Sequence, residues 1–313
     1  MIIALAVSLN ILTDHAAVPI MQAEAAACAP LSGEITTGTS EHTLTAGGID
    51  RSYRVYIPPG YASSQPTALV LALHGFAQGA ELLQAEATWD AVADEHEIIV
   101  AYPQGTGFPV RWHSDGGFDE DGGDDVAFLR TLITTLIADY CIDPARVYIN
   151  GFSNGGGMAH RMACEAADVV AAIGGVAGAY STPTECTPSR PVPVIAFHGD
   201  ADMVVDYTGA DDQFDLPAIP DWAAGWAARN DCDLEAESLP VQGAVSGIRY
   251  TDCADDADVV LYTIAGGGHT WPGGPGEVPA FIVGATTQDI DASAAMWEFF
   301  QRHTLPGDLL TEE

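Results

Sequence analysis

Short apolar runs alternate with amphipathic stretches along most of this chain. The apolar runs cover 53–57, 68–75, 98–103, 146–151, 169–178, 193–200 and 258–266. Most of them are continuous and β-branched, which is typical of strands that are covered on both faces. Helical periodicity marks 80–96, 126–140, 156–166, 221–230 and 290–303. Because strands alternate with helices, the pattern predicts an α/β fold with a mostly parallel central sheet and helices on both faces.

Composition and charge restrict what such a fold can bind. The 313 residues are 48% hydrophobic, and no linker or internal repeat divides them, so we expect one domain. The chain carries 44 acidic residues against 10 basic ones, all of them Arg, and its formal net charge is -34. This charge argues against nucleic acid and anionic membranes as partners. Salt adaptation and a compositional bias of the genome both explain the acidity, and the sequence leaves both open.

The N-terminal segment, residues 1–27, resembles a secretory signal peptide. Its apolar part, MIIALAVSLNIL, is followed by the small-residue stretch AEAAAC. No Arg or Lys precedes the apolar part, so a cytosolic tail is the alternative, and a lipid anchor at Cys28 is a lesser one. We expect a secreted, monomeric domain over 28–313 with no membrane contact, because no later apolar run reaches the ~18 residues that span a bilayer.

Six cysteines, an even number, fit an oxidising compartment. They are Cys28, Cys141, Cys164, Cys186, Cys232 and Cys253. Cys232 and Cys253 bracket one short polar segment and are the pair we expect to form a disulfide. The other four allow three connectivities, which the sequence does not separate. Buried free thiols in a cytosolic enzyme are the alternative.

The stretch YINGFSNGGGMAHRM places Ser153 in a G-x-S-x-G pattern between an apolar run and a helical one. Glycines on both sides permit a tight strand-to-helix turn, which exposes the serine oxygen beside the amino end of the helix. A serine hydroxyl becomes a nucleophile only when a base removes its proton, and the base needs an orienting carboxylate. The pattern alone is weak evidence, because it also arises by chance.

Candidates for the base and the carboxylate follow later strands. His269 lies in GGGHTWPGG after the last apolar run, and the order Ser, Asp, His is the one that α/β-hydrolases use. In FHGDADMVVDY, Asp200, Asp202 and Asp206 compete for the orienting role, and their distance from the strand does not decide among them. We interpret His198 and His74, each followed by Gly at a strand end, as structural residues.

Six blocks of sequence together resemble the secreted polyhydroxybutyrate depolymerase and feruloyl esterase family, which is grouped with carbohydrate esterase family one. The blocks are RSYRVYIPPGY, LVLALHGFAQ, DDVAFLRTLI, CIDPARVYINGFSNGGGMAHRMAC, RPVPVIAFHGDADMVVDY and GGGHTWPGG. The resemblance implies an α/β-hydrolase fold, with Ser153 as nucleophile, His269 as general base and then acid, and Asp202 as orienting acid. The chain departs from the family at Asp200, Met203 and Asp206. The carboxylates of Asp200 and Asp206 crowd Asp202, and we expect like-charge repulsion to raise its pKa.

Residues around the triad complete the expected site. The backbone amides of Asn154, after the nucleophile, and of Phe76, in the loop after LVLAL, are the candidate oxyanion donors. Trp112 and Trp271 are candidate aromatic walls for a flat acyl group. For Trp222 and Trp226, four apart on a helix, we favour the core over a cap on the cleft. The acidic stretch DGGFDEDGGDD invites a calcium interpretation, but we favour a solvated loop because Gly occupies one ligand position.

The sequence therefore predicts a secreted serine esterase that acts through an acyl-enzyme and needs neither cofactor nor metal. The expected substrates are hydroxycinnamoyl (feruloyl) esters of plant polysaccharide, or polyhydroxybutyrate-type polyesters and their oligomers. Esterases of acetylxylan or of synthetic aromatic polyesters are the alternative within this chemistry. A serine peptidase and a non-catalytic binding protein on the same fold are alternatives outside it.

Overall fold

The computed structural model describes residues 28, 35–115, 123–181, 186–210, 216–276, 279–307 and 309. Over these residues the chain forms a ten-stranded sheet with the strand order β1-β2-β4-β3-β5-β6-β7-β10-β9-β8. The strands are β1 (Gly38–Ala46), β2 (Ile49–Ile57), β3 (Thr67–Leu73), β4 (Ile99–Pro103), β5 (Ile142–Phe152), β6 (Ala172–Val176), β7 (Val194–Gly199), β8 (Glu237–Gln242), β9 (Val245–Tyr250) and β10 (Val259–Ile264). The central strands, from β4 to β10 in the sheet, are parallel, and the antiparallel pairs β1–β2 and β9–β8 extend the two edges.

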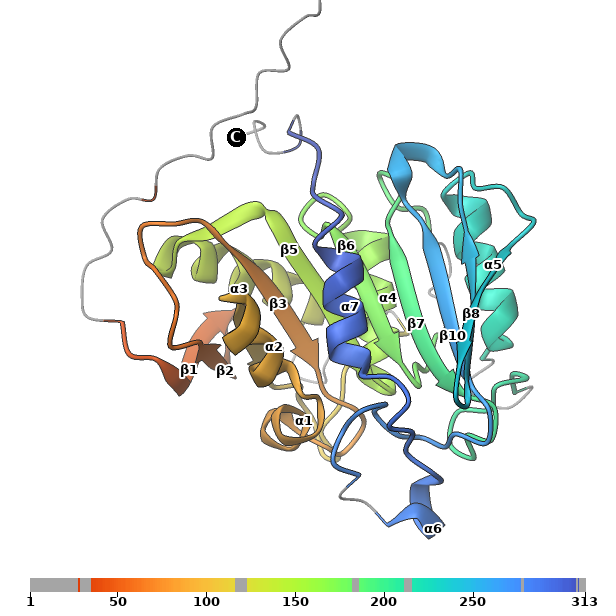
Figure 1. The fold of residues 1–313 in the computed structure, drawn as a ribbon. Coiled ribbons are helices and arrows are strands. Elements are labelled where there is room, and N and C mark those ends of the chain that lie inside the picture. The colour runs from red at the N-terminus through yellow and green to blue at the C-terminus, as the bar shows by residue number, and fades with distance from the viewer. Residues whose placement is uncertain are drawn as a thin grey trace, which may run out of the picture.

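Helices cover both faces of this sheet (Figure 1). They are α1 (Ala80–Glu86), α2 (Trp89–His96), α3 (Asp125–Asp139), α4 (Asn154–Glu165), α5 (Ile219–Arg229), α6 (Ala280–Val283) and α7 (Ala292–Phe300), with a 3-10 turn at Ala254–Asp256. Buried side chains of α3, α4 and α5 join one hydrophobic core, and those of α1, α2 and α7 join the other. Along β3, Leu69 and Leu71 pack on the first core and Val70 and Ala72 on the second. The predicted α/β architecture is confirmed. None of the described helices has the length and apolarity that crossing a bilayer requires.

The structure departs from the sequence prediction at the sheet edges and in one helix. The edge strands β1 and β8 expose many of their side chains, so they lack the continuous apolar run that marked the central strands. The segment 80–96 is two helices rather than one, because Thr88 adopts a positive φ of 52° between α1 and α2.

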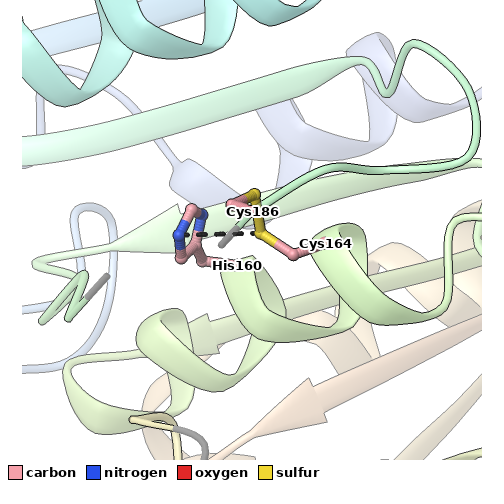
Figure 2. A group of neighbouring side chains, drawn as sticks. All are labelled: His160, Cys164 and Cys186. Carbon is pink, nitrogen blue, oxygen red and sulfur yellow. Dashed lines mark hydrogen bonds between the residues drawn. A yellow bond between two sulfur atoms is a disulfide. The ribbon is translucent and has the colours of Figure 1, made fainter. Parts of the chain in front are cut away.

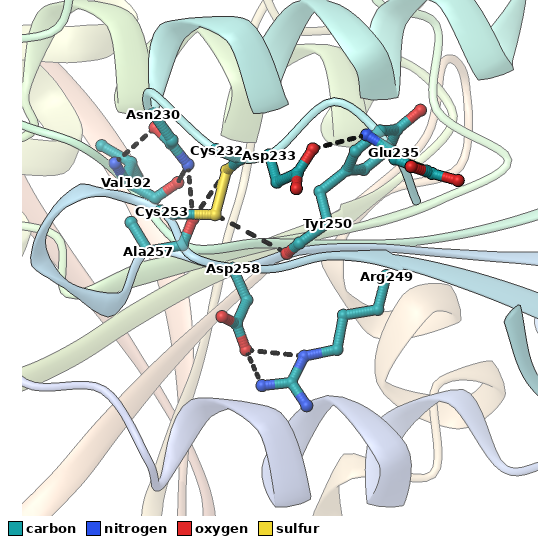
Figure 3. Close-up of a disulfide and its surroundings, with 10 residues drawn as sticks. All are labelled: Val192, Asn230, Cys232, Asp233, Glu235, Arg249, Tyr250, Cys253, Ala257 and Asp258. Atoms are coloured by element: carbon teal, nitrogen blue, oxygen red, sulfur yellow. Dashed lines mark hydrogen bonds and ion pairs between the residues drawn. A yellow bond between two sulfur atoms is a disulfide. The ribbon is translucent and has the colours of Figure 1, made fainter. Parts of the chain in front are cut away.

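All six cysteines are paired, so the alternative of free thiols is wrong. The disulfides are Cys28–Cys141, Cys164–Cys186 and Cys232–Cys253. Figure 3 shows the expected Cys232–Cys253 pair, which closes a segment holding the β8–β9 hairpin. Beside it, the buried Asn230 side chain donates to the carbonyl oxygens of Val192 and Ala257. The disulfide thus ties the segment after β9 to the end of α5, and Asn230 ties the same end of α5 to the segments before β7 and β10.

Candidate active site

Ser153 occupies a sharp turn between β5 and α4. Its φ of 53° and ψ of -117° form a backbone conformation that residues other than glycine seldom adopt. The flanking glycines are required by close approach. A Cβ at Gly155 would lie 2.1 Å from the Leu73 carbonyl oxygen, and a Cβ at Gly151 would lie 2.2 Å from the backbone of Gly155. The G-x-S-x-G spacing therefore produces the tight strand-to-helix turn that the sequence predicted.

Asp202 and His269 meet across the loops that follow β7 and β10. His269 Nδ1 lies 2.7 Å from Asp202 Oδ2, and both residues are buried. Since a carboxylate only accepts hydrogen bonds, Nδ1 carries the proton and donates it, which leaves Nε2 unprotonated in the neutral imidazole. Among the described residues, Asp202 is the one of the three competing carboxylates that contacts this histidine.

The hydrogen bonds of Asp202 are complete. Oδ1 accepts from the backbone amides of Val204 and Val205 at 2.8 and 2.9 Å, and Oδ2 lies 3.4 Å from His198 Nε2 as well as near His269. Burial opposes ionisation, but hydrogen bonds from the two imidazoles and attraction to His269 hold the pKa of the Asp202 carboxyl well below its usual value.

The expectation that neighbouring acids raise the pKa of Asp202 is therefore wrong. Asp200 is exposed, and its carboxylate accepts from the Gly266 amide at 2.6 Å. Asp206 is also exposed, and its carboxylate accepts from the amide and the hydroxyl of Thr208. Both charges are solvated and bonded to other groups, so hydrogen bonds to Asp202 outweigh like-charge repulsion.

The two histidines interpreted as structural hold loops beside the site. His198 Nε2 lies 2.9 Å from the Val205 carbonyl oxygen and so helps to close the turn that contains Asp202. His74 Nε2 accepts from the Gly105 amide at 2.9 Å, which leaves Nδ1 to donate to the Gly75 carbonyl oxygen at 2.7 Å. Burial lowers the pKa of His74 and favours the neutral form that this pattern needs.

Ser153 and His269 line one cavity of about 320 Å³. The side chains of Phe76, Leu82, Phe152, Val204, Trp271 and Val283 give it mostly apolar walls. The ring of Phe152 lies 4.8 Å from that of His269, centroid to centroid. Among the hydrogen bonds of the described residues, none joins Ser153 directly to His269. Bonds between a nucleophile and its base often form fully only when substrate binds.

The backbone amides of Phe76 and Asn154, on either side of the Ser153 turn, have no acceptor among the residues that the structure describes. Asn154 is the first residue of α4, where an amide has no partner within its own helix. Phe76 lies in the loop after β3, and that loop packs against the Ser153 turn: a Cβ at Gly75 would lie 3.4 Å from Ser153 Cβ. Unpaired amides of this kind can stabilise developing negative charge.

Comparisons with known proteins identify the family. Residues 51–190 match the family model described as "Esterase PHB depolymerase". The "Putative esterase NocK" of Nocardia uniformis subsp. tsuyamanensis is 31% identical over 284 residues, which are 83% of this chain and 82% of that protein. The chain belongs to the PHB depolymerase family of esterases. This esterase is a carboxylic ester hydrolase, as the sequence predicted.

Other relatives carry more specific names. The "Feruloyl esterase B" of Piromyces equi is 30% identical over 233 residues, which are 70% of this chain but only 42% of that protein. The "Feruloyl esterase C" of Emericella nidulans is 26% identical over 278 residues, which are 87% of this chain and 93% of that protein. Among solved structures, an acetyl xylan esterase from Aspergillus awamori superposes with a TM-score of 0.59 at 17% identity, covering 84% of this chain and 99% of that one. This last likeness supports the α/β-hydrolase fold.

The tryptophans of the esterase divide between cavity and core. Trp271 lines the cavity, as expected. Trp112 does not line it, contrary to the expectation. It is 2% exposed, its indole nitrogen donates to the His74 carbonyl oxygen at 3.0 Å, and its ring stacks on Phe128. Trp222 and Trp226 lie in the core, as favoured.

Two sets of residues in the esterase invite a metal interpretation. Residues 116–122 of the acidic loop lie outside the described part of the chain. After them, Asp124 accepts from the Val126 amide at the start of α3. His160, Cys164 and Cys186 form the second set, but the two sulfurs are joined in a disulfide and offer no thiolate to a metal (Figure 2). His160 Nδ1 instead lies 3.1 Å from the indole nitrogen of Trp226, and burial lowers the pKa of His160 to about 3.

Sequence reasoning missed two polar residues of the cavity wall, Gln78 and Glu86. Gln78 Nε2 donates to Glu86 Oε2 at 2.5 Å, and Gln78 Oε1 accepts from the Gly75 amide at 2.7 Å. A glutamine and a glutamate near a helix normally read as surface residues, so the sequence offers no signal for this pair.

Proposed function

We propose that this esterase hydrolyses esters through an acyl-enzyme formed on Ser153. His269 Nε2 takes the proton of the Ser153 hydroxyl as the oxygen attacks the ester carbonyl, and then gives it to the leaving alcohol. Asp202 orients the imidazole and balances the positive charge that it gains. The observation that carries the proposal is the 2.7 Å bond from His269 Nδ1 to Asp202, beside a cavity that His269 shares with Ser153.

The tetrahedral intermediate needs donors for its oxyanion. The amides of Phe76 and Asn154 are unpaired among the described residues and flank the Ser153 turn, which supports this role for both. Each such donor contributes about 3 kcal/mol to stabilisation of the transition state in other serine hydrolases. Water then attacks the acyl-enzyme as His269 removes its proton, and the same donors stabilise the second intermediate. This intermediate collapses when the bond to Ser153 Oγ breaks, His269 returns the proton to that oxygen, and the acid is released.

The substrates we propose are hydroxycinnamoyl esters of plant polysaccharide, and next to them polyesters of the hydroxyalkanoate type. Names of relatives, feruloyl esterase and PHB depolymerase, support both. Phe76, Phe152 and Trp271 give the cavity aromatic walls suited to a flat acyl group. At about 320 Å³ the cavity is also larger than an acetyl group needs, which favours these substrates over acetylxylan.

We also propose that the protein is exported as one catalytic domain over residues 28–313. The three disulfides support an oxidising compartment, and the sheet from β1 to β10 with α7 packed on it supports a single unit.

The test compares the wild type with Ser153→Ala in two measurements, covalent labelling by an active-site probe and turnover of an ester substrate. A fluorophosphonate probe should label the peptide containing Ser153 in the wild type alone, and the variant should lose at least about 10⁴-fold in kcat while keeping its melting temperature. Retained turnover in the variant would disprove the mechanism. A panel of methyl ferulate, hydroxybutyrate oligomers and acetylxylan, compared by kcat/KM, ranks the substrate classes. The highest value on acetylxylan would contradict our substrate proposal.

A further inference from the structure

The amides that flank Phe76 in the loop after β3, those of Gly75, Ala77 and Gln78, are all paired. The Gly75 amide donates to Gln78 Oε1 at 2.7 Å, the Ala77 amide donates to the Val110 carbonyl oxygen at 2.8 Å, and the Gln78 amide donates to the Gly75 carbonyl oxygen at 3.3 Å. Among the described residues 75–78, the Phe76 amide alone has no acceptor. The direction of this unpaired N–H group depends on how firmly the neighbouring peptides are held.

Gln78 holds Gly75 on both sides. Its side-chain oxygen fixes the peptide before Gly75, and its own amide, together with His74 Nδ1, fixes the carbonyl after it. That carbonyl and the Phe76 N–H belong to one planar peptide and point in opposite directions. Anchoring the Gly75 carbonyl therefore sets the direction of the Phe76 N–H.

Glu86 fixes the side chain of Gln78 in turn. Because Oε1 of Gln78 faces an N–H group, its Nε2 must be the atom that faces Glu86, and it donates to Oε2 at 2.5 Å. A carboxylate acceptor polarises the amide and strengthens its oxygen as an acceptor for Gly75. Glu86 is the last residue of α1, so the loop is braced on a helix.

We propose that Gln78, braced by Glu86, is a positioning residue that aims the Phe76 amide at the oxyanion. The proposal rests on the proposed function, in which Phe76 donates to the oxyanion. Stabilisation by such a donor is lost when its position shifts by about 0.5 Å or 10–20°. The Gln78 side chain bonds to the Gly75 amide and to Glu86 rather than to Ser153, so it acts through the loop.

The first test is Gln78→Ala, measured with methyl ferulate and with phenylboronic acid, which forms a tetrahedral adduct with an active-site serine. We expect kcat to fall about 10- to 100-fold, less than the 10²–10³ for complete loss of a donor, with KM changed less than about threefold. Affinity for the boronate should fall with kcat. Gln84→Ala is the matched control, because Gln84 lies on α1 and bonds to Arg54 and Asp90 away from the cavity. If Gln78 had a purely structural role, the substitution would lower the melting temperature without lowering kcat selectively over KM. A kcat within twofold of the wild type would overturn the proposal.

The second test exchanges the two side chains. Q78E alone sets two carboxylates against each other and should lower kcat at least as much as Gln78→Ala. In Q78E/E86Q the new carboxylate still accepts from the Gly75 amide, and the new amide at position 86 donates back to it. We expect kcat of the double variant to return to within about fivefold of the wild type, which is a strong positive coupling. A double variant no better than Q78E would overturn the proposal, while loss of activity in Ser153→Ala would still support the proposed function.

Discussion

Replacing Asp202 with asparagine keeps the size of the side chain but reverses one hydrogen bond. The asparagine oxygen can still accept from the amides of Val204 and Val205. Its NH₂ group then faces His269 Nδ1, which can no longer donate and must accept. The proton moves to Nε2, the nitrogen that should take the proton from Ser153. We expect kcat to fall about 10⁴-fold, equivalent to about 5.5 kcal/mol of activation free energy.

The same substitution should lower stability in a pH-dependent way. The charge-assisted hydrogen bond from His198 is lost and that with His269 becomes a neutral one. Because a charge-assisted bond is worth about 1.5–3 kcal/mol and a neutral one about 0.5–1.5, the free energy of unfolding should fall by about 2–4 kcal/mol at pH 7. The pKa of the Asp202 carboxyl is depressed in the folded protein. The stability that ionised Asp202 contributes is therefore fully present above the pKa of about 3.9 that the carboxyl has in the unfolded chain. It is lost as the pH falls from there through the lower pKa of the folded protein.

The assay pairs methyl ferulate turnover with urea unfolding of wild type and Asp202→Asn at pH 7, 5 and 3. The difference in unfolding free energy should be the same at pH 7 and 5 and should shrink by about 1 kcal/mol at pH 3. Asp200→Asn is the control, because the exposed Asp200 carboxylate accepts from the Gly266 amide, which an asparagine oxygen can also do. If Asp200→Asn impaired turnover as much as Asp202→Asn, or if the stability difference were unchanged at pH 3, the reasoning would be refuted.

Two further predictions concern the tryptophans and the charge. Trp271→Leu should raise KM for methyl ferulate about tenfold, because it removes an aromatic wall of the cavity. Trp112→Leu should lower the free energy of unfolding by about 3 kcal/mol with little change in KM, because Trp112 is buried in the core. The reverse pattern would contradict these positions of the two side chains. Because the net charge is -34, screening of repulsion among the acidic side chains should raise the melting temperature between 0.05 and 2 M sodium chloride. Guanidinium chloride at low concentration also screens charge but does not strengthen the hydrophobic effect, so it should separate the two causes. A melting temperature that stays flat or falls would contradict the prediction.

The sequence could predict the central sheet because each of its strands is buried on both faces. Continuous apolar runs mark β3, β5 and β7. Short sequence motifs at the ends of such strands then indicate where the candidate site residues lie. Ser153 and His269 could be found in this way because glycines next to them have steric reasons to be there. The edge strands have no such signal, since their exposed faces accept almost any polar residue.

Distances between loops could not be predicted. Asp200, Asp202 and Asp206 stand within seven positions of one another, and only the folded turn shows which carboxylate reaches His269. Likewise, the sequence places Trp112 in a loop after β4 but does not say which way the indole turns, and it turns into the core. Gln78 is recognisable only once the Gly75 amide is seen to need an acceptor.

The geometry of the site depends on the register of the sheet as much as on its loops. Parallel pairing sets Leu73 opposite Gly151, Val176 opposite Phe197, and Gly199 opposite Ile264, so the loops carrying Phe76, Ser153, Asp202 and His269 leave the sheet at nearly one level. A slip of one residue between β7 and β10 would move His269 by about 3.3 Å relative to Asp202 and turn the strand's side chains to the opposite face. A hydrogen bond of 2.7 Å does not survive such a shift. The pairing of β7 with β10 therefore also fixes the distance between the imidazole and its carboxylate.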